Sequence, residues 1–260
     1  TGIPNFLIMP SRKVKTRDEK RGRLKLDSMS KTRTRDRFHL ISLGCSKNTV
    51  DSEAMADKLG QAGFSATEKA KQAEILIVNT CGFIGPAREE SIATLRELAQ
   101  TKRKGQMLIA AGCLAQRYGA QVVEWAPGVD GVIGTRRWMD IVGFVQKLRL
   151  RGGPEPLYHL PEEAKTVGIT EPDTQWSAVQ GVSAYLKIAD GCRRPCAFCS
   201  IPLIKGTAVS RPLESLISEA RHLRDQGVRE LILIAQDSTD YGYDLGLKDG
   251  LSVLMESLVK

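Results

Sequence analysis

Residues 75–81 read ILIVNTC, an apolar run that ends in two polar residues and a cysteine. Two other stretches repeat this arrangement, FHLISLGC at 38–45 and MLIAAGC at 107–113. Each apolar run has the length of a buried strand, and an amphipathic stretch follows each one. The pattern predicts helices over 49–61, 87–101 and 115–125. Strands that alternate with such helices form parallel α/β sheets.

The rest of the chain extends this pattern into a second region. A short strand at 131–134 and a helix at 138–150 complete an open parallel α/β sheet domain over residues 38–150. Residues 151–177 contain four prolines and no clear periodicity, which is typical of a linker. Residues 178–260 contain a predicted strand, helix, strand and helix start, at 182–189, 210–227, 230–237 and 250–260. We interpret them as the first βα units of a TIM-like partial barrel.

Three cysteines, Cys45, Cys81 and Cys113, follow the three predicted strands directly. The carboxyl ends of parallel strands share one edge of a sheet, so residues far apart in the sequence can converge there. A single cysteine at such a place is often an ordinary core residue. Three at one edge, each beside a glycine that allows close backbone approach, favour a metal site. We interpret these strand-end cysteines as ligands of an iron–sulfur cluster with one iron open.

The other three cysteines lie close together in GCRRPCAFCSIPLIKG, residues 191–206. Cys192, Cys196 and Cys199 have the spacing C-x-x-x-C-x-x-C, and we call them the loop cysteines. Three thiolates on one loop can hold three irons of a four-iron cluster and leave the fourth open to a chelating ligand. A structural zinc site needs a fourth Cys or His, and a ferredoxin run needs a fourth cysteine. His222, the nearest histidine, lies beyond the loop, so the open cluster is favoured.

The net charge of +8 comes from one end of the chain. Residues 1–37 contain twelve Lys and Arg against four Asp and Glu, and the remainder is balanced. We expect a basic disordered tail that contacts RNA or ribosomes weakly at most. The chain starts with Thr, and Met29 precedes the first predicted strand, so we expect residues 1–28 to be an upstream extension.

The composition places the chain among soluble globular proteins of a reducing compartment. Hydrophobic residues make up 42% and charged residues 26%. No apolar run approaches the ~20 residues of a membrane span, and the opening residues are a poor signal peptide. Six cysteines without an export signal favour metal ligation in the cytoplasm over disulfides.

Six motifs of this sequence occur together in one enzyme family. They are LGCSKNTVDSE (43–53), VNTCGFI (78–84), AGCLAQRY (111–118), GCRRPCAFCSIPLIKG (191–206), SRP (210–212) and AQDSTDYG (235–242). In this combination the chain resembles the methylthiotransferases, which are radical S-adenosylmethionine (SAM) enzymes with two clusters. The resemblance implies that 38–150 is their N-terminal domain and that 178–260 is the truncated start of their radical SAM barrel. We expect such a fragment to be incomplete for turnover.

The residues beside the cysteines resemble the RimO branch of the family. The chain has GCSKN at 44–48, NTCGFI at 79–84 and AQDS at 235–238, whereas the tRNA-modifying MiaB branch typically has GCQMN, NTCSIR and a GQN-type strand end. RimO proteins insert a methylthio group at the β-carbon of an aspartate in ribosomal protein S-twelve. The alternatives are a tRNA adenosine methylthiotransferase, an iron–sulfur scaffold or electron carrier, and a two-zinc structural protein.

The resemblance also assigns cofactors and partners. The loop cysteines would bind the [4Fe-4S] cluster that cleaves S-adenosyl-L-methionine, and the strand-end cysteines a second, auxiliary [4Fe-4S] cluster that carries the inserted sulfur. We expect Phe198 near the adenine, and Gln236 and Asp237 near the methionine moiety. No catalytic residue is expected beyond the cluster ligands. The expected partners are ribosomal protein S-twelve and an electron donor such as flavodoxin or ferredoxin, with no membrane.

Overall fold

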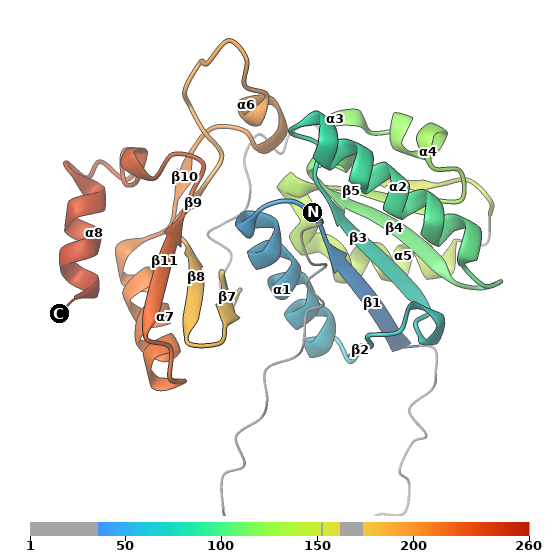
Figure 1. Cartoon of the computed structure of the whole chain (residues 1–260), viewed down its shortest axis with the longest axis horizontal. Helices are drawn as coiled ribbons and strands as arrows, with labels where there is room; N and C mark the ends of the chain where they lie inside the picture. The colour runs from blue at the N-terminus through green and yellow to red at the C-terminus, as the bar shows by residue number, and fades with distance from the viewer. Residues whose placement is uncertain (1–35, 152, 162–173, 260) are drawn as a thin grey trace, which may run out of the picture.

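The computed structural model describes residues 36–151, 153–161 and 174–259. It contains a six-stranded sheet, a three-stranded sheet and a two-stranded pair, with helices between and outside them (Figure 1). Residues 1–35 of the predicted basic tail lie outside the described residues. Within the described part, no helix is long and apolar enough to cross a membrane.

The six-stranded sheet is parallel throughout, with the strand order β2-β1-β3-β4-β5-β6. This confirms the predicted parallel α/β sheet. Its strands are β1 (Arg37–Ser42), β2 (Ser65–Ala66), β3 (Ile75–Thr80), β4 (Met107–Gly112), β5 (Gly131–Gly134) and β6 (Leu157–His159).

Helices cover both faces of this sheet, which is why the strand sequences are continuously apolar. Successive side chains of a strand alternate between faces. Ile75 and Ile77 of β3 therefore pack against one helix layer, and Leu76 and Val78 against the other. The first layer contains α1 (Ser46–Gln61), η3 (Thr135–Asp140) and α5 (Ile141–Leu150), and the second α2 (Gly85–Thr101), α3 (Cys113–Tyr118) and α4 (Gln121–Trp125). A short turn, η2 (Ala70–Gln72), precedes β3.

Two segments of this half differ from the sequence expectation. The helix expected over 115–125 is two helices, because Gly119 adopts a positive φ of 51° at the end of α3. The segment 151–177, expected as a linker, contains β6, which pairs in parallel with β5 as the edge strand of the sheet. Three residues in an otherwise proline-rich segment are too few for a period-2 pattern to show.

The second half of the chain forms a smaller sheet with the order β11-β8-β7. Strands β8 and β11 are parallel, whereas β7 forms an antiparallel pair with β8. The elements here are β7 (Ser177–Gln180), β8 (Ser183–Lys187), β9 (Ala189–Asp190), α6 (Ile201–Lys205), β10 (Val209–Ser210), α7 (Leu213–Asp225), β11 (Glu230–Ile234), η4 (Ser238–Asp240) and α8 (Gly250–Leu258). The expected strand 182–189 is thus divided between β8 and β9, and β9 pairs with β10.

The two sheets are joined by one hydrophobic core in which α1 lies between them (Figure 1). Val50 of α1 belongs to the same buried cluster as Ala178 of β7 and Ile234 of β11. The rings of Trp138 and Trp176 meet edge to face across this contact, with centroids 5.3 Å apart. Helices α7 and α8 cover the outer face of the second sheet. Helix α1 therefore places the end of the first sheet against the second half of the chain.

Candidate functional site

The strand-end cysteines lie together at the carboxyl edge of the large sheet. Cys45 follows β1 and is the N-cap residue of α1. Cys81 follows β3, and Cys113 is the first residue of α3 after β4. Because β1, β3 and β4 are neighbours in register, the three chain segments leave the sheet side by side. Cys81 and Cys113 are buried and Cys45 is exposed.

Glycines let these segments approach each other more closely than any other residue would allow. A Cβ atom at Gly44 would lie 2.7 Å from Cys81 Cβ and 3.0 Å from its Sγ. A Cβ atom at Gly82 would lie 2.7 Å from Leu114 Cα and 3.2 Å from the carbonyl carbon of Cys113. All four distances are shorter than ordinary van der Waals contacts. The glycine beside each cysteine therefore brings its segment against the next one.

Two buried asparagines fix the same segments. Asn48 donates from Nδ2 to the carbonyl oxygens of Leu43 at 2.8 Å and Thr80 at 3.1 Å. Its Oδ1 lies 3.9 Å from the Sγ of Cys113, which donates to it. Asn79 donates from Nδ2 to the carbonyl oxygen of Asn48 at 3.0 Å. Asn48 lies three residues after Cys45 and Asn79 two residues before Cys81.

Burial determines the protonation of two strand-end cysteines in the metal-free protein. It raises the pKa of the Cys81 thiol, and it raises that of Cys113 to about 12 even though Lys205 nearby lowers it. Binding of a metal to these sulfurs must therefore release protons.

The loop cysteines lie on the segment between β9 and α6. The backbone N–H of Cys192 donates to the carbonyl oxygen of Gly206 at 3.0 Å, which closes the base of the loop. Gly191 has a φ of 77°, and a Cβ there would overlap the carbonyl oxygen of Thr207. The N–H of Cys199 donates to the carbonyl oxygen of Cys196 at 3.1 Å.

Two arginines between the loop cysteines attach the loop to the end of β11. Arg193 makes two contacts of 2.7 Å with the carboxylate of Asp240 and stacks over the ring of Tyr243 at 3.7 Å. Arg194 donates from Nε to Asp237 at 2.9 Å. Bidentate arginine–carboxylate pairs have a defined geometry. The arginines thus hold the loop against the segment that follows β11.

Both sets of cysteines open into one cavity of about 1240 Å³. The cysteines that line it are Cys45, Cys81, Cys113, Cys192 and Cys199. Cys196 is exposed and is not among the lining residues. The sequence separates the two sets by about eighty residues, whereas the fold places them around a single space between the two sheets.

The three other predicted site residues lie in different surroundings. Gln236 lines the cavity, and its Oε1 is buried without a hydrogen-bond partner among the described residues. Asp237 is bound to Arg194 and does not line the cavity. Phe198 is 90% exposed and also lies outside the cavity lining.

Two charged residues of the cavity were not predicted from the sequence. Glu53 lines it, and burial raises the pKa of its carboxyl to about 7. From the sequence, an acidic residue near an expected helix start needs no role beyond its match to the helix dipole, but α1 begins at Ser46, seven residues before Glu53. Lys205 also lines the cavity, 1% exposed, in a stretch whose composition gives no sign of burial.

Across residues 36–151, 153–161 and 174–259, no three Cys, His, Asp or Glu side chains are placed to hold one metal ion.

Comparisons with known proteins agree with the motifs. The profile of the Uncharacterized protein family UPF0004 matches residues 37–134. The chain is 43% identical over 237 residues to the ribosomal protein uS12 methylthiotransferase RimO of Roseiflexus sp. (strain RS-1), covering 85% of this chain and 50% of that protein. It is 44% identical over 232 residues to the RimO of Chloroflexus aurantiacus, covering 85% of this chain and 51% of that protein.

The fold also has a solved counterpart. The radical S-adenosylmethionine methyltransferase TsrM from Kitasatospora setae superposes with a TM-score of 0.53 at 13% identity, over 85% of this chain and 50% of that chain. At this identity the likeness shows the fold alone. The chain spans about half the length of the curated relatives it matches. The predicted resemblance to the methylthiotransferases and the predicted fold class are confirmed.

Proposed function

We propose that this chain, which resembles the RimO methylthiotransferases over 85% of its length, acts in the insertion of a methylthio group at the β-carbon of an aspartate in ribosomal protein uS12. The observation that carries the proposal is that five of the six cysteines, three from the strand-end set and two from the loop set, line a single cavity. Sulfur insertion into a C–H bond requires the radical source and the sulfur carrier to reach the same substrate atom. One shared cavity meets that requirement.

The strand-end cysteines fit a [4Fe-4S] cluster with one open iron. Each of Cys45, Cys81 and Cys113 supplies one thiolate, and each cluster iron takes one such ligand. A Cβ at Gly44 or Gly82 would clash with the neighbouring segment, so glycine at these positions lets the backbone lie close to the cysteines. We assign this set to the auxiliary cluster.

The loop cysteines fit the cluster that binds S-adenosylmethionine. Cys192 and Cys199 line the cavity, and the paired arginines hold their loop against the end of β11. The unpaired Oε1 of Gln236 is an acceptor beside this loop, suited to the amino group of the methionine moiety. We assign Asp237 to positioning Arg194 rather than to contact with the cofactor.

The chemistry of the bound groups and that of the chain are separate. When bound, the cofactors supply the radical that removes a hydrogen atom and the sulfur and methyl groups that replace it. The chain supplies six thiolates, orients the two cysteine sets across the cavity, and lines that cavity largely with apolar groups that limit the access of water. No side-chain base is required for an unactivated carbon.

The proposed partners follow from the same reaction. We infer a cytoplasmic enzyme that acts on ribosomal protein uS12 and receives electrons from a donor such as flavodoxin or ferredoxin. The basic residues of 1–37 would add a weak contact with the ribosome or RNA. The residues beside the cysteines, GCSKN at 44–48, NTCGFI at 79–84 and AQDS at 235–238, favour uS12 over tRNA as the substrate.

The first test measures S-adenosylmethionine cleavage by this chain. After anaerobic reconstitution with iron and sulfide, reduction with dithionite should give 5′-deoxyadenosine. Replacing the loop cysteines by alanine should abolish the product, whereas replacing the strand-end cysteines should not. A Gln236→Leu variant should bind S-adenosylmethionine more weakly, and Asp237→Asn much less so. Cleavage that survives loss of the loop cysteines would refute the assignment.

The second test identifies the substrate. The chain, and a longer protein that contains it, would be expressed in a host that lacks methylthiotransferases. Mass spectrometry of uS12 should show one added methylthio group for the longer protein. Methylthio-adenosine in tRNA, without any change in uS12, would favour the tRNA-modifying alternative.

A further inference from the structure

Four buried charges lie where the two halves of the chain meet. They are Asp51 of α1, Lys187 of β8, Asp190 of β9 and Lys205 of α6, with side chains at most 2% exposed. Lys187 Nζ lies 2.6 Å from the carboxylate of Asp51 and also contacts Asp190. Lys205 Nζ lies 3.1 Å from Asp51 and 3.1 Å from Asp190. We call these residues the charge quartet, in which each ammonium contacts both carboxylates.

Electrostatics keep Lys205 and Asp190 of the quartet charged despite their burial. Burial alone would lower the pKa of Lys205, but Asp190 and Asp51 hold it well above its usual value. Burial would likewise raise the pKa of Asp190, whereas Lys187 and Lys205 hold it well below its usual range. Two lysine and two aspartate side chains therefore meet beside the apolar core that joins the two sheets.

Stability alone does not explain such a group. Buried ion pairs are often no more stabilising than apolar side chains of the same volume, because desolvation of the charges offsets their attraction. The apolar contacts around the quartet are non-directional, so they tolerate sliding of one half against the other. Charged contacts do not tolerate such sliding, because a displaced ammonium or carboxylate group would be left buried and unpaired. The quartet thus selects one arrangement of the halves.

The quartet also lies next to both cysteine sets. Asp190 accepts a hydrogen bond of 2.9 Å from the backbone N–H of Gly191, the residue before Cys192. Lys205 lines the same cavity as Cys113. Asp51 lies on α1, the helix that Cys45 caps. A shift of any quartet member would therefore move one cysteine set relative to the other.

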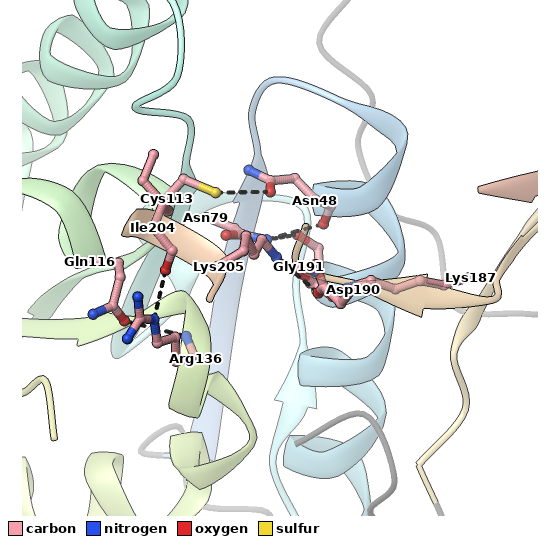
Figure 2. A network of polar contacts seen from close by, with 12 residues as sticks. Asn48, Asn79, Cys113, Gln116, Arg136, Lys187, Asp190, Gly191, Ile204 and Lys205 are labelled. Atoms are coloured by element: carbon pink, nitrogen blue, oxygen red, sulfur yellow. Dashed lines mark hydrogen bonds and ion pairs between the residues drawn. The ribbon is translucent and has the colours of Figure 1, made fainter. Parts of the chain in front are cut away.

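We propose that the charge quartet is a positioning device that sets the separation of the two cysteine sets across the cavity, and that Lys205 is the positioning residue common to both. The inference rests on the proposed function, because a fixed separation has a purpose only if both sets serve one substrate. Arg136 of η3 also fixes the helix that carries Lys205. It donates to the carbonyl oxygen of Ile204 at 2.9 Å (Figure 2) and to that of Leu203 at 2.6 Å, and these bonds hold α6 against η3.

The experiment measures the distance between the halves in the whole 260-residue chain. Nitroxide labels would be attached through p-acetylphenylalanine at the exposed positions Glu97 of α2 and Arg221 of α7, which leaves every cysteine intact. Double electron–electron resonance would then give the distance distribution, both without metal and after iron–sulfur reconstitution. The key variant is Asp51→Leu with Lys187→Met, which removes one charge of each sign and fills the space with apolar groups.

A matched control removes a similar pair from the surface of one half, Arg151→Met with Glu155→Leu. We expect the quartet variant to melt near the parent temperature and yet lose the single narrow distance peak, with the control unchanged in both. The single variant Asp51→Asn should lose the peak and melt lower, and Lys205→Arg should retain the peak.

The result that overturns the proposal is a narrow, parent-like peak in the quartet variant. If the quartet variant unfolds instead, Asp51→Asn is measured at a temperature where it remains folded. A narrow, parent-like peak in Asp51→Asn then overturns the proposal. A purely structural quartet would make peak width follow melting temperature in every variant. Because the distance is measured without metal as well, failure of the chain to bind iron would refute the proposed function and leave this result standing.

Discussion

Replacing Gly44 by alanine tests whether close backbone packing holds the strand-end cysteines. Gly44 has a φ of 95°, and its new Cβ would lie 2.7 Å from Cys81 Cβ and 3.0 Å from Cys81 Sγ. The neighbour cannot move far, since Cys81 is buried and its backbone N–H donates to Ser91 at 3.0 Å. We therefore expect Gly44→Ala to displace the Cys81 sulfur.

The magnitude follows from two separable contributions. An L-residue in the left-handed region costs about 1–2 kcal/mol, and overpacking a well-packed site costs about 1–3 kcal/mol more. Gly63 is the matched control, because its φ is 91° and nothing lies within 4 Å of its Cβ position. Gly63→Ala should thus lower the free energy of unfolding by the first cost only. Gly44→Ala should lower it by both costs, a total of about 2–5 kcal/mol.

The assay combines unfolding with metal content. Urea unfolding of the metal-free chains gives the free-energy difference, and iron and sulfide are measured after anaerobic reconstitution. The parent and Gly63→Ala should bind about eight irons and Gly44→Ala about four, because only the cluster of the strand-end cysteines is affected. Equal stability and equal iron in the two glycine variants would refute the reasoning.

Three further outcomes follow from the structure. Replacing Cys45, Cys81 and Cys113 together by alanine should lower the iron content from about eight to about four, and no change in iron would contradict two separate clusters. Burial raises the pKa of Glu53 to about 7 from an ordinary 4.5. Between these two values the folded state binds more protons than the unfolded state, so stability falls as the pH rises through them. Glu53→Gln should remove this fall, which is measured as the urea midpoint from pH 4 to 8. Arg136→Met leaves two carbonyl oxygens of α6 unpaired, which should cost about 1–3 kcal/mol and speed hydrogen exchange in α6 while β3 stays protected.

The parallel sheet and its cysteine edge could be predicted from local patterns. The runs that end at Cys45, Cys81 and Cys113 are buried strands because parallel strands between two helix layers need apolar residues on both sides. Their carboxyl ends meet by topology, so the convergence of the cysteines needed no knowledge of contacts. The C-x-x-x-C-x-x-C spacing likewise placed the second set on one loop.

The sequence was less informative where a residue acts through a distant partner. Asp237 was expected to end a strand over 230–237, but β11 ends at Ile234, and Asp237 instead caps η4 and pairs with Arg194 of the cysteine loop. The aromatic Phe198 lies beside a loop cysteine in the sequence, yet its ring is exposed. Glu53 resembles any acidic residue near a helix start, and only its burial in the cavity distinguishes it.

The sequence by itself determined the alternation of strands and helices, the six cysteines and their two groups, because these depend on residue type and spacing within one segment. The tertiary structure alone decided that both groups face one cavity and that Asp51, Lys187, Asp190 and Lys205 meet inside the contact between the sheets. The physical reason is that the residues next to a charged side chain in the sequence do not show whether it is buried. The free energy of burying it depends on partners up to 154 positions away in the chain, which only folding brings together.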